Sequence, residues 1–170
     1  IGKFTFSIPT IAAAMDAVTD TSFAITMSKL GGLAVLNLEG VQTRYDNPQE
    51  ILSEISQAPA SEITSLLQKI YSRPIKESLI VQRIQEIKSG GAICAVSITP
   101  ANTKQFAPVA SEAGADILVI QSTVTTTRHI SKSYRGLIFN ELCESVPIPV
   151  IVGNCVSYNA CLELMRTGIS

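Results

Sequence analysis

Short apolar runs alternate with amphipathic stretches along nearly the whole chain. The apolar runs predict strands at 4–6, 9–14, 33–38, 92–98, 116–121 and 149–153. Apolar residues at helical spacing predict helices at 21–30, 48–56, 61–72, 75–89, 101–113, 136–145 and 157–167. Glycines follow several of these helices and act as stop signals, and Asp20 or Thr21 suits the start of the first.

Near-continuous apolar strands that alternate with helices are typical of a parallel sheet with helices outside it. Two features favour a barrel over an open Rossmann sheet. The strands are short and regular and end in polar residues, and no G-x-G-x-x-G follows the first of them. A closed barrel needs eight strands and about 250 residues. We therefore expect an α/β fold, a partial (β/α)8 TIM barrel of the first five βα units, with residues 1–170 as part of one domain.

Small or polar residues follow the strands, at the sheet edge where barrel proteins bind their ligands. Met15 and Asp16 follow the strand at 9–14, and Asn37 and Glu39 lie at the end of the next. From the pattern alone, Met15 can fill the barrel mouth and Asp16 can serve as a turn residue. Contact with a ligand is the alternative for both residues.

Two further segments carry candidate chemistry. Arg44 and Tyr45 follow the strand at 33–38, and they suit either an anion with a ring ligand or a solvated loop with one helix-facing aromatic. Gly153 and Asn154 close the strand at 149–153, and a glycine there permits close backbone approach to a ligand.

The charge and the apolar runs exclude several classes of partner. The net charge is −1, so neither nucleic acid nor an anionic membrane is expected. No uncharged apolar run approaches 18 residues, and the N-terminal residues do not resemble a signal peptide, so we expect a cytoplasmic protein. At 46% hydrophobic residues, the chain can bury a substantial core.

The cysteines and the histidine give no sign of a metal centre. His129 is alone in a polar loop, where solvation is more common than a catalytic role. No C-x-x-C pair is present, and we expect reduced, buried thiols and no metal ligands. The four cysteines are Cys94, Cys143, Cys155 and Cys161.

Several unrelated stretches together carry a family resemblance. They read IPTIAAAMD, NLEGVQTRY, RIQEIKSGGAICAVSITP, AGADILVIQ and VPIPVIVGNCVSYNACLELMRTG. In order and spacing they resemble the IMP dehydrogenase/GMP reductase family over essentially the whole chain. The string NLEGVQTRY resembles the corresponding sequence in the branch of the family that lacks the regulatory CBS domains. The resemblance implies the N-terminal portion of the family's barrel.

The resemblance also implies a nucleotide site. In the family, the residue matching Met15 packs on the purine, and the stretch before it lies at the ribose phosphate. Many members have a serine where this chain has Ala13, so one hydroxyl donor is missing here. The family uses the residue matching Asn154 near the nucleotide. The nucleotide-binding residues implied are thus Ala13, Met15 and Asn154.

A cofactor site is implied at Gln121, Ser122 and Thr123. Classical IMP dehydrogenases have an Asp-Ser pair at the first two of these positions, where it holds the nicotinamide ribose. Gln121 can still form a hydrogen bond to a ribose hydroxyl, although it carries no charge. The choice between NAD and NADP is therefore open.

The parent reaction implied is NAD-dependent oxidation of IMP to XMP through a cysteine thioimidate, a step of purine biosynthesis. The family's catalytic cysteine lies one βα unit beyond Cys155, after a glycine-rich phosphate loop. We therefore expect no catalytic residue among these 170 residues, a packing role for Cys155, and no activity from this chain by itself. In full-length proteins the resemblance also implies a monovalent-cation site and a homo-oligomer, commonly a tetramer.

Three alternatives stay open. An NADPH-dependent GMP reductase shares the same nucleotide site and binds IMP or GMP. A catalytically inactive half-barrel would act only by association, since an open parallel sheet exposes edges and apolar surface. A barrel of another family that binds FMN or phosphate is the third, and the absence of an aromatic-rich or basic cofactor loop argues against it.

Overall fold

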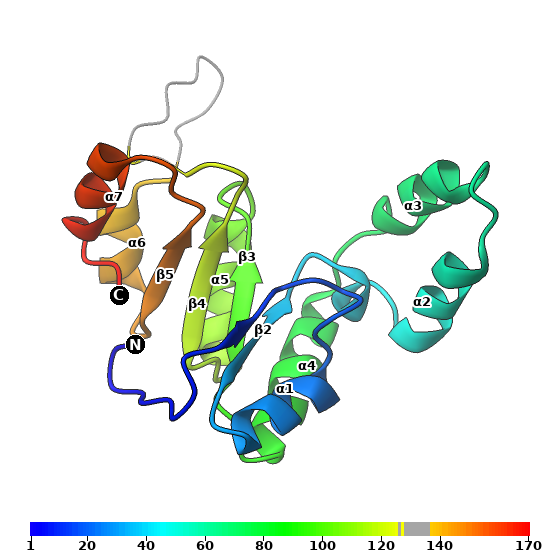
Figure 1. Cartoon of the computed structure of the whole chain (residues 1–170), viewed down its shortest axis with the longest axis horizontal. Helices are drawn as coiled ribbons and strands as arrows, with labels where there is room; N and C mark the ends of the chain where they lie inside the picture. The colour runs from blue at the N-terminus through cyan, green and yellow to red at the C-terminus, as the bar shows by residue number, and fades with distance from the viewer. Residues whose placement is uncertain (126, 128–136) are drawn as a thin grey trace.

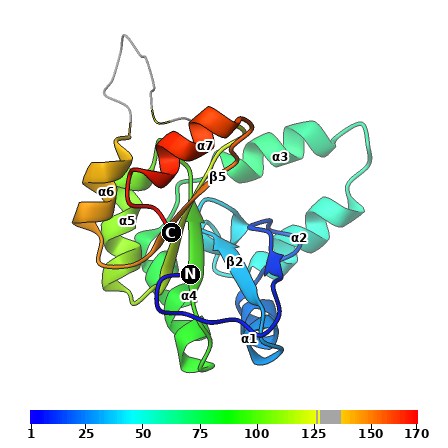
Figure 2. The same cartoon turned by 60° about the vertical axis from the view of Figure 1, so that its left-hand side comes forward.

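The computed structural model describes residues 1–125, 127 and 137–170. Within these residues five strands form one sheet in the order β1-β2-β3-β4-β5, and each neighbouring pair is parallel. The predicted strand order is therefore confirmed. The sheet curls into a half-barrel with helices against its outer face, which is a partial (β/α)8 barrel (Figures 1 and 2). The strands are β1 (Ile11–Ala12), β2 (Leu33–Asn37), β3 (Ala95–Ile98), β4 (Ile117–Gln121) and β5 (Val150–Gly153).

The predicted helices are present with small shifts at their ends. Asp20 caps α1, because its carboxylate accepts the Phe23 N–H at 2.7 Å. In the described part of the chain, no helix is long and apolar enough to cross a membrane. The helices are α1 (Thr21–Lys29), the 3-10 helix η1 (Val41–Thr43), α2 (Pro48–Gln57), α3 (Ile63–Tyr71), α4 (Glu77–Ser89), α5 (Thr103–Glu112), α6 (Phe139–Ser145) and α7 (Tyr158–Met165).

The N-terminal segment departs from the prediction. Residues 4–6 do not form a strand, and the strand predicted at 9–14 is reduced to β1. Phe4 and Phe6 instead pack against the apolar residues on the inner face of the sheet. The segment begins beside the start of β5, where Gly2 lies against Pro149, and then runs to β1. Phe4 and Phe6 are therefore partly buried by packing across the sheet and not by strand pairing.

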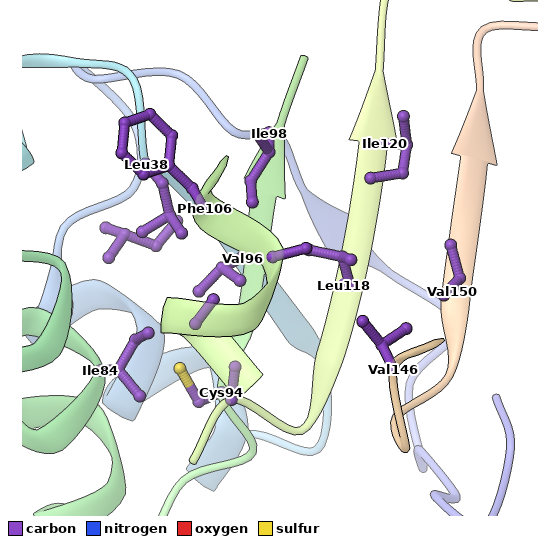
Figure 3. Packing of buried hydrophobic residues seen from close by; sticks show 14 of the residues in the cluster. Leu38, Ile84, Cys94, Val96, Ile98, Phe106, Leu118, Ile120, Val146 and Val150 are labelled. Atoms are coloured by element: carbon purple, nitrogen blue, oxygen red, sulfur yellow. The ribbon is translucent and has the colours of Figure 1, made fainter. Parts of the chain in front are cut away.

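Helices cover the outer face of the sheet and the N-terminal segment packs against part of the inner face, which explains the near-continuous apolar strands. Alternate side chains of β3 and β4, including Val96 and Leu118, point outward and pack with Ile84 of α4 and Phe106 of α5 (Figure 3). The intervening side chains form a smaller inner cluster. The buried members of that cluster are Leu33, Val35, Ala95 and Ile117.

Helices α2 and α3 form an arm, defined here as residues 48–73, that extends away from the barrel (Figure 1). Ile70, near the end of α3, is the one fully buried residue of these two helices. The arm therefore meets the body of the protein mainly at the end of α3. This end lies close to the loops that follow β1 and β2, where the site residues are found.

Candidate functional site

The carboxyl ends of all five strands lie at one edge of the sheet, because every pair is parallel. The predicted site residues fall into two groups on either side of β3. Met15 and Asn37 belong to the loops after β1 and β2. Ser122 and Asn154 follow β4 and β5, and Gln121 ends β4 opposite Gly153. The first group is held by contacts of the β1 and β2 loops, and the second by contacts of the β4 and β5 loops.

The loop after β1 is a closed turn that presents Met15. The Ala13 carbonyl accepts the Met15 N–H at 2.9 Å and the Thr19 hydroxyl at 2.9 Å. The Met15 carbonyl in turn accepts the N–H groups of Val18 and Thr19, both at 2.9 Å. The Met15 side chain is 56% exposed. It therefore does not fill the core, and it is free to contact a ligand at this edge.

Asp16 connects three segments of the chain. Its Oδ2 accepts the Val41 N–H at 3.1 Å and the Tyr71 hydroxyl at 2.6 Å. Its Oδ1 is buried and has no hydrogen-bond partner among the described residues. The same carboxylate lies directly against Gly40. Asp16 is thus more than a turn residue, since it joins the β1 loop to the β2 loop and to α3.

Tyr71 is a stable hydrogen-bond donor in this arrangement. Partial burial, together with the hydrogen bond to Asp16 and its negative charge, raises the pKa of Tyr71 well above its usual value. Its hydroxyl therefore keeps its proton throughout the physiological range. The Arg44 guanidinium lies 6.0 Å from the centre of the Tyr71 ring.

The loop after β2 is also bonded to the end of β3. The Asn37 side-chain oxygen accepts the Glu39 N–H at 2.9 Å, which fixes the start of the loop. The Glu39 carboxylate accepts the Thr99 N–H at 2.7 Å and the Thr99 hydroxyl at 2.8 Å. Asn37 and Glu39 therefore shape the edge of the site.

Arg44 and Tyr45 hold the arm. The Arg44 Nε donates to the Glu39 carbonyl at 2.9 Å, and its Nη1 donates to the Arg73 carbonyl. The Tyr45 hydroxyl donates to the Ile70 carbonyl at 3.1 Å. Both side chains thus satisfy carbonyls at the end of α3, where a helix leaves such groups unpaired. The sequence alternative of a helix-facing aromatic agrees with the contact of Tyr45 with α3, whereas the docking role of Arg44 was not predicted.

The second group is built by the loops after β4 and β5. The Ser122 N–H donates to the Gly153 carbonyl at 2.8 Å, and the Asn154 N–H donates to the Ser122 carbonyl at 3.0 Å. The Thr125 N–H donates to the Asn154 carbonyl at 2.8 Å. The Ser122 hydroxyl is bonded to the Val124 carbonyl at 3.0 Å and to the Thr125 hydroxyl at 2.8 Å. Ser122 therefore has an internal structural role.

Three polar side chains of this group face solvent. Gln121, Thr123 and Asn154 are exposed, and their side chains make no hydrogen bond to the described residues. They can therefore bond a ligand more readily than Ser122 can. The prediction on His129 falls outside the residues that the structure describes.

None of the four cysteines has the environment of an activated nucleophile. Burial, with a smaller effect of the Asp116 charge, raises the pKa of Cys94 to about 12. Partial burial also raises the pKa of Cys143. The Cys155 thiol donates to the Ser157 carbonyl at 3.5 Å, and Cys161 is partly buried. Across residues 1–125, 127 and 137–170, no three metal-ligating side chains form a cluster.

Sequence reasoning missed the connections that Asp16 makes. Its partner Tyr71 lies 55 residues away, and Glu39 lies 60 residues from Thr99. No local sequence pattern predicts either contact. The one usable signal was Gly40 in the NLEGVQTRY string, because a glycine just after a strand end can mark a close approach of another segment.

Comparisons with known proteins agree with this architecture. The family model for the IMP dehydrogenase/GMP reductase domain matches residues 2–170. An uncharacterized oxidoreductase of Mycolicibacterium smegmatis is 32% identical over 173 residues, which cover 99% of this chain and 46% of the relative. An uncharacterized oxidoreductase of Mycobacterium tuberculosis is 31% identical with the same coverage.

A solved structure gives the same result in three dimensions. The crystal structure of an IMP dehydrogenase/GMP reductase-like protein from Corynebacterium glutamicum superposes with a TM-score of 0.91 and 32% sequence identity. The match covers 98% of this chain and 45% of that protein. The chain thus spans about half the length of the relatives it matches.

Proposed function

The chain belongs to the IMP dehydrogenase/GMP reductase family, and we propose that it forms the nucleotide-binding half of an NAD-dependent enzyme that oxidises IMP to XMP. The family is one of oxidoreductases. The observation that carries the proposal is the exposed Met15 side chain, held on a closed loop at the carboxyl edge of the half-barrel. In this position a thioether can pack on the flat face of a purine.

The residues of the β1 loop fit a nucleotide in part. Ala13 offers no side-chain hydroxyl, and its carbonyl is already used by Met15 and Thr19. Phosphate recognition by this loop therefore depends on other groups. Asn154 supplies an exposed amide on the other side of the sheet edge, where it can donate and accept hydrogen bonds. We assign the base to Met15 and a polar part of the nucleotide to Asn154.

The residues at the end of β4 fit a nicotinamide cofactor. Gln121 and Thr123 present exposed polar groups for ribose hydroxyls, whereas the Ser122 hydroxyl is bonded internally. When bound, the cofactor supplies the acceptor for a hydride from the purine. The role of Gln121 and Thr123 is to orient the cofactor. Without a negative charge at Gln121, this contact does not by itself reject the phosphate of NADP.

A binding measurement tests the nucleotide site. We expect IMP to bind the 170-residue chain in isothermal titration calorimetry, and Met15→Ala to weaken binding about tenfold, because a buried Met contact contributes about 1.5–3 kcal/mol when complete. Met165→Ala is the matched control. Met165 is 64% exposed at the end of α7, on a helix that returns from the carboxyl edge of the sheet.

The outcomes separate the alternatives. Equal IMP affinity in wild type and Met15→Ala would contradict the assignment of Met15. Binding of GMP with clear preference over IMP would favour the reductase. Absence of binding of either nucleotide at millimolar concentration would leave the half-barrel without a nucleotide function of its own and would overturn the proposal.

A further inference from the structure

We propose that Tyr71, at the end of the arm, is a positioning residue that fixes the Met15–Asp16 loop for the nucleotide through its hydrogen bond to Asp16. The inference rests on the proposed nucleotide site and adds to it a residue from a segment outside the regular βα repeat. Tyr71 lies 55 residues beyond Asp16 in the chain, and the residue is 40% exposed.

The Asp16 carboxylate depends on few donors. Its Oδ2 receives the Tyr71 hydroxyl at 2.6 Å and the Val41 N–H at 3.1 Å. Its Oδ1 is buried and finds no donor within the described residues. A hydrogen bond to an ionised carboxylate is stronger than one between neutral groups, and more so in a partly buried site. Removal of the tyrosine hydroxyl therefore leaves the carboxylate with a single, longer hydrogen bond.

A displacement of Asp16 is passed on to Met15. The two residues are adjacent, and the Met15 N–H and carbonyl are both fixed within the turn that runs from Ala13 to Thr19. The Asp16 carboxylate is the side-chain contact that ties this turn to the β2 loop and to α3. Since the Met15 side chain is exposed, no core packing holds it in place. The anchor on Asp16 is what orients it.

The arm itself does not need the Tyr71 hydroxyl to remain docked. The Tyr45 hydroxyl bonds the Ile70 carbonyl at 3.1 Å, and Arg44 bonds the Arg73 carbonyl. The Lys76 N–H also donates to the Thr43 carbonyl at 2.9 Å. These three hydrogen bonds hold the end of α3 through backbone carbonyls and do not involve the Tyr71 hydroxyl. The bond from Tyr71 is therefore the contact that acts on the β1 loop.

The test compares two variants that each lose one phenolic hydroxyl from the same interface, Tyr71→Phe and Tyr45→Phe. Two measurements are made on the 170-residue chain. The first is the exchange rate of the Val41 amide proton by NMR, without ligand. The second is the affinity for IMP by calorimetry. We expect Tyr71→Phe to speed exchange at Val41 and to weaken IMP binding about fivefold, a part of what a charged hydrogen bond contributes. Tyr45→Phe should leave both close to wild type, because Arg44 and the Lys76 N–H still hold the end of α3.

A double-variant cycle identifies the route of the effect. In an Asp16→Ala background, Tyr71→Phe should cause no further loss of IMP affinity, because its partner is gone. An independent loss there would overturn the positioning role. So would equal IMP affinity in wild type and Tyr71→Phe, and the proposed nucleotide site would stand. If wild type binds no IMP, the proposed function fails. The exchange rate at Val41 then decides whether Tyr71 fixes the loop.

Discussion

The carboxylate of Asp16 lies so close to Gly40 that a side chain at Gly40 has no room. A Cβ atom built on Gly40 would fall 1.7 Å from Asp16 Oδ1 and 2.4 Å from its carboxyl carbon. The φ angle of Gly40 is −92°, in the range that any residue adopts. Glycine is thus needed here for space and not for backbone conformation. The β1 and β2 loops approach each other over this one missing side chain.

We expect Gly40→Ala to destabilise the chain by about 1–3 kcal/mol, the usual cost of overpacking a tight contact. The added methyl group must push Asp16 away from Val41 and Tyr71, so IMP affinity should fall as well. Urea denaturation followed by circular dichroism measures the first effect. In an Asp16→Ala background the same Gly40→Ala change should cost much less, because the clash is relieved. An equal cost in both backgrounds would show that the close approach is not the cause.

Much of the barrel was predictable from the sequence because its signals are local. Gly31, Gly91, Gly114 and Gly168 all have positive φ angles just past helix ends, where glycine is favoured. These glycines, with the apolar strand pattern, place the βα units to within a few residues. Parallel strand order then follows from sequential right-handed connections. Residues 4–6 were mispredicted as a strand because Phe4 and Phe6 carry a strand-like pattern, but they instead pack, partly buried, against the inner face of the sheet.

The candidate site was predictable only as far as its residues follow strand ends. Met15 and Asn154 could be placed at the carboxyl edge from the strand pattern alone. The contacts that hold the edge could not be, because Asp16–Tyr71 and Glu39–Thr99 join segments with no shared periodicity. For Ser122 the cofactor contact stays a prediction. Its resemblance to a cofactor contact was clear, but its hydroxyl is bonded to Val124 and Thr125.

The buried guanidinium of Arg83 should stabilise the loop that follows β2. Arg83 is 6% exposed and donates to the Gln42 carbonyl at 3.0 Å, to the Asp46 carbonyl at 3.0 Å and to Glu86 at 2.8 Å. Arg83→Met should lower the free energy of unfolding by about 2–4 kcal/mol, because buried carbonyls lose charged donors. Arg166→Met, on the exposed end of α7, is the matched control and should change it little. Similar urea midpoints for both variants would contradict this role.

The pKa of Cys94 predicts a pH dependence of stability. In the folded chain burial raises this pKa to about 12, compared with an ordinary value of 9.0. Above pH 9 the unfolded thiol loses its proton and the folded thiol keeps it, so the folded state is progressively disfavoured. The stability of wild type relative to Cys94→Ala should therefore fall by about 1 kcal/mol between pH 8 and pH 10. A difference that is constant over this range would show that the thiol is not protected by burial.

The same burial predicts the order of thiol labelling. Cys94 is 0% exposed, whereas Cys155 and Cys161 are partly exposed. With iodoacetamide at pH 8, we expect Cys155 and Cys161, which share the tryptic peptide 136–166, to be alkylated in the native chain. The peptide with Cys94 should be alkylated only after urea is added, because the thiolate is the reactive form. Mass spectrometry of tryptic peptides measures this, and native labelling of Cys94 would contradict the packing of β3.

The last prediction concerns turnover. Assayed by itself with IMP and NAD, the 170-residue chain should produce no NADH above the level without protein. Covalent attack on a purine needs a thiolate held beside the base, and loss of such a nucleophile costs many orders of magnitude in rate. Cys94 is buried, the pKa of Cys143 is raised, and the Cys155 thiol is bonded to the Ser157 carbonyl.

The sharpest control for this assay is Cys155→Ser, because Cys155 follows β5 at the same sheet edge as Asn154. We expect wild type and Cys155→Ser to be equally inactive while both retain IMP affinity, which separates binding from chemistry. Turnover in wild type that disappears in Cys155→Ser would identify Cys155 as the nucleophile. It would also show that residues 1–170 are sufficient for turnover, which contradicts the expectation drawn from the family resemblance.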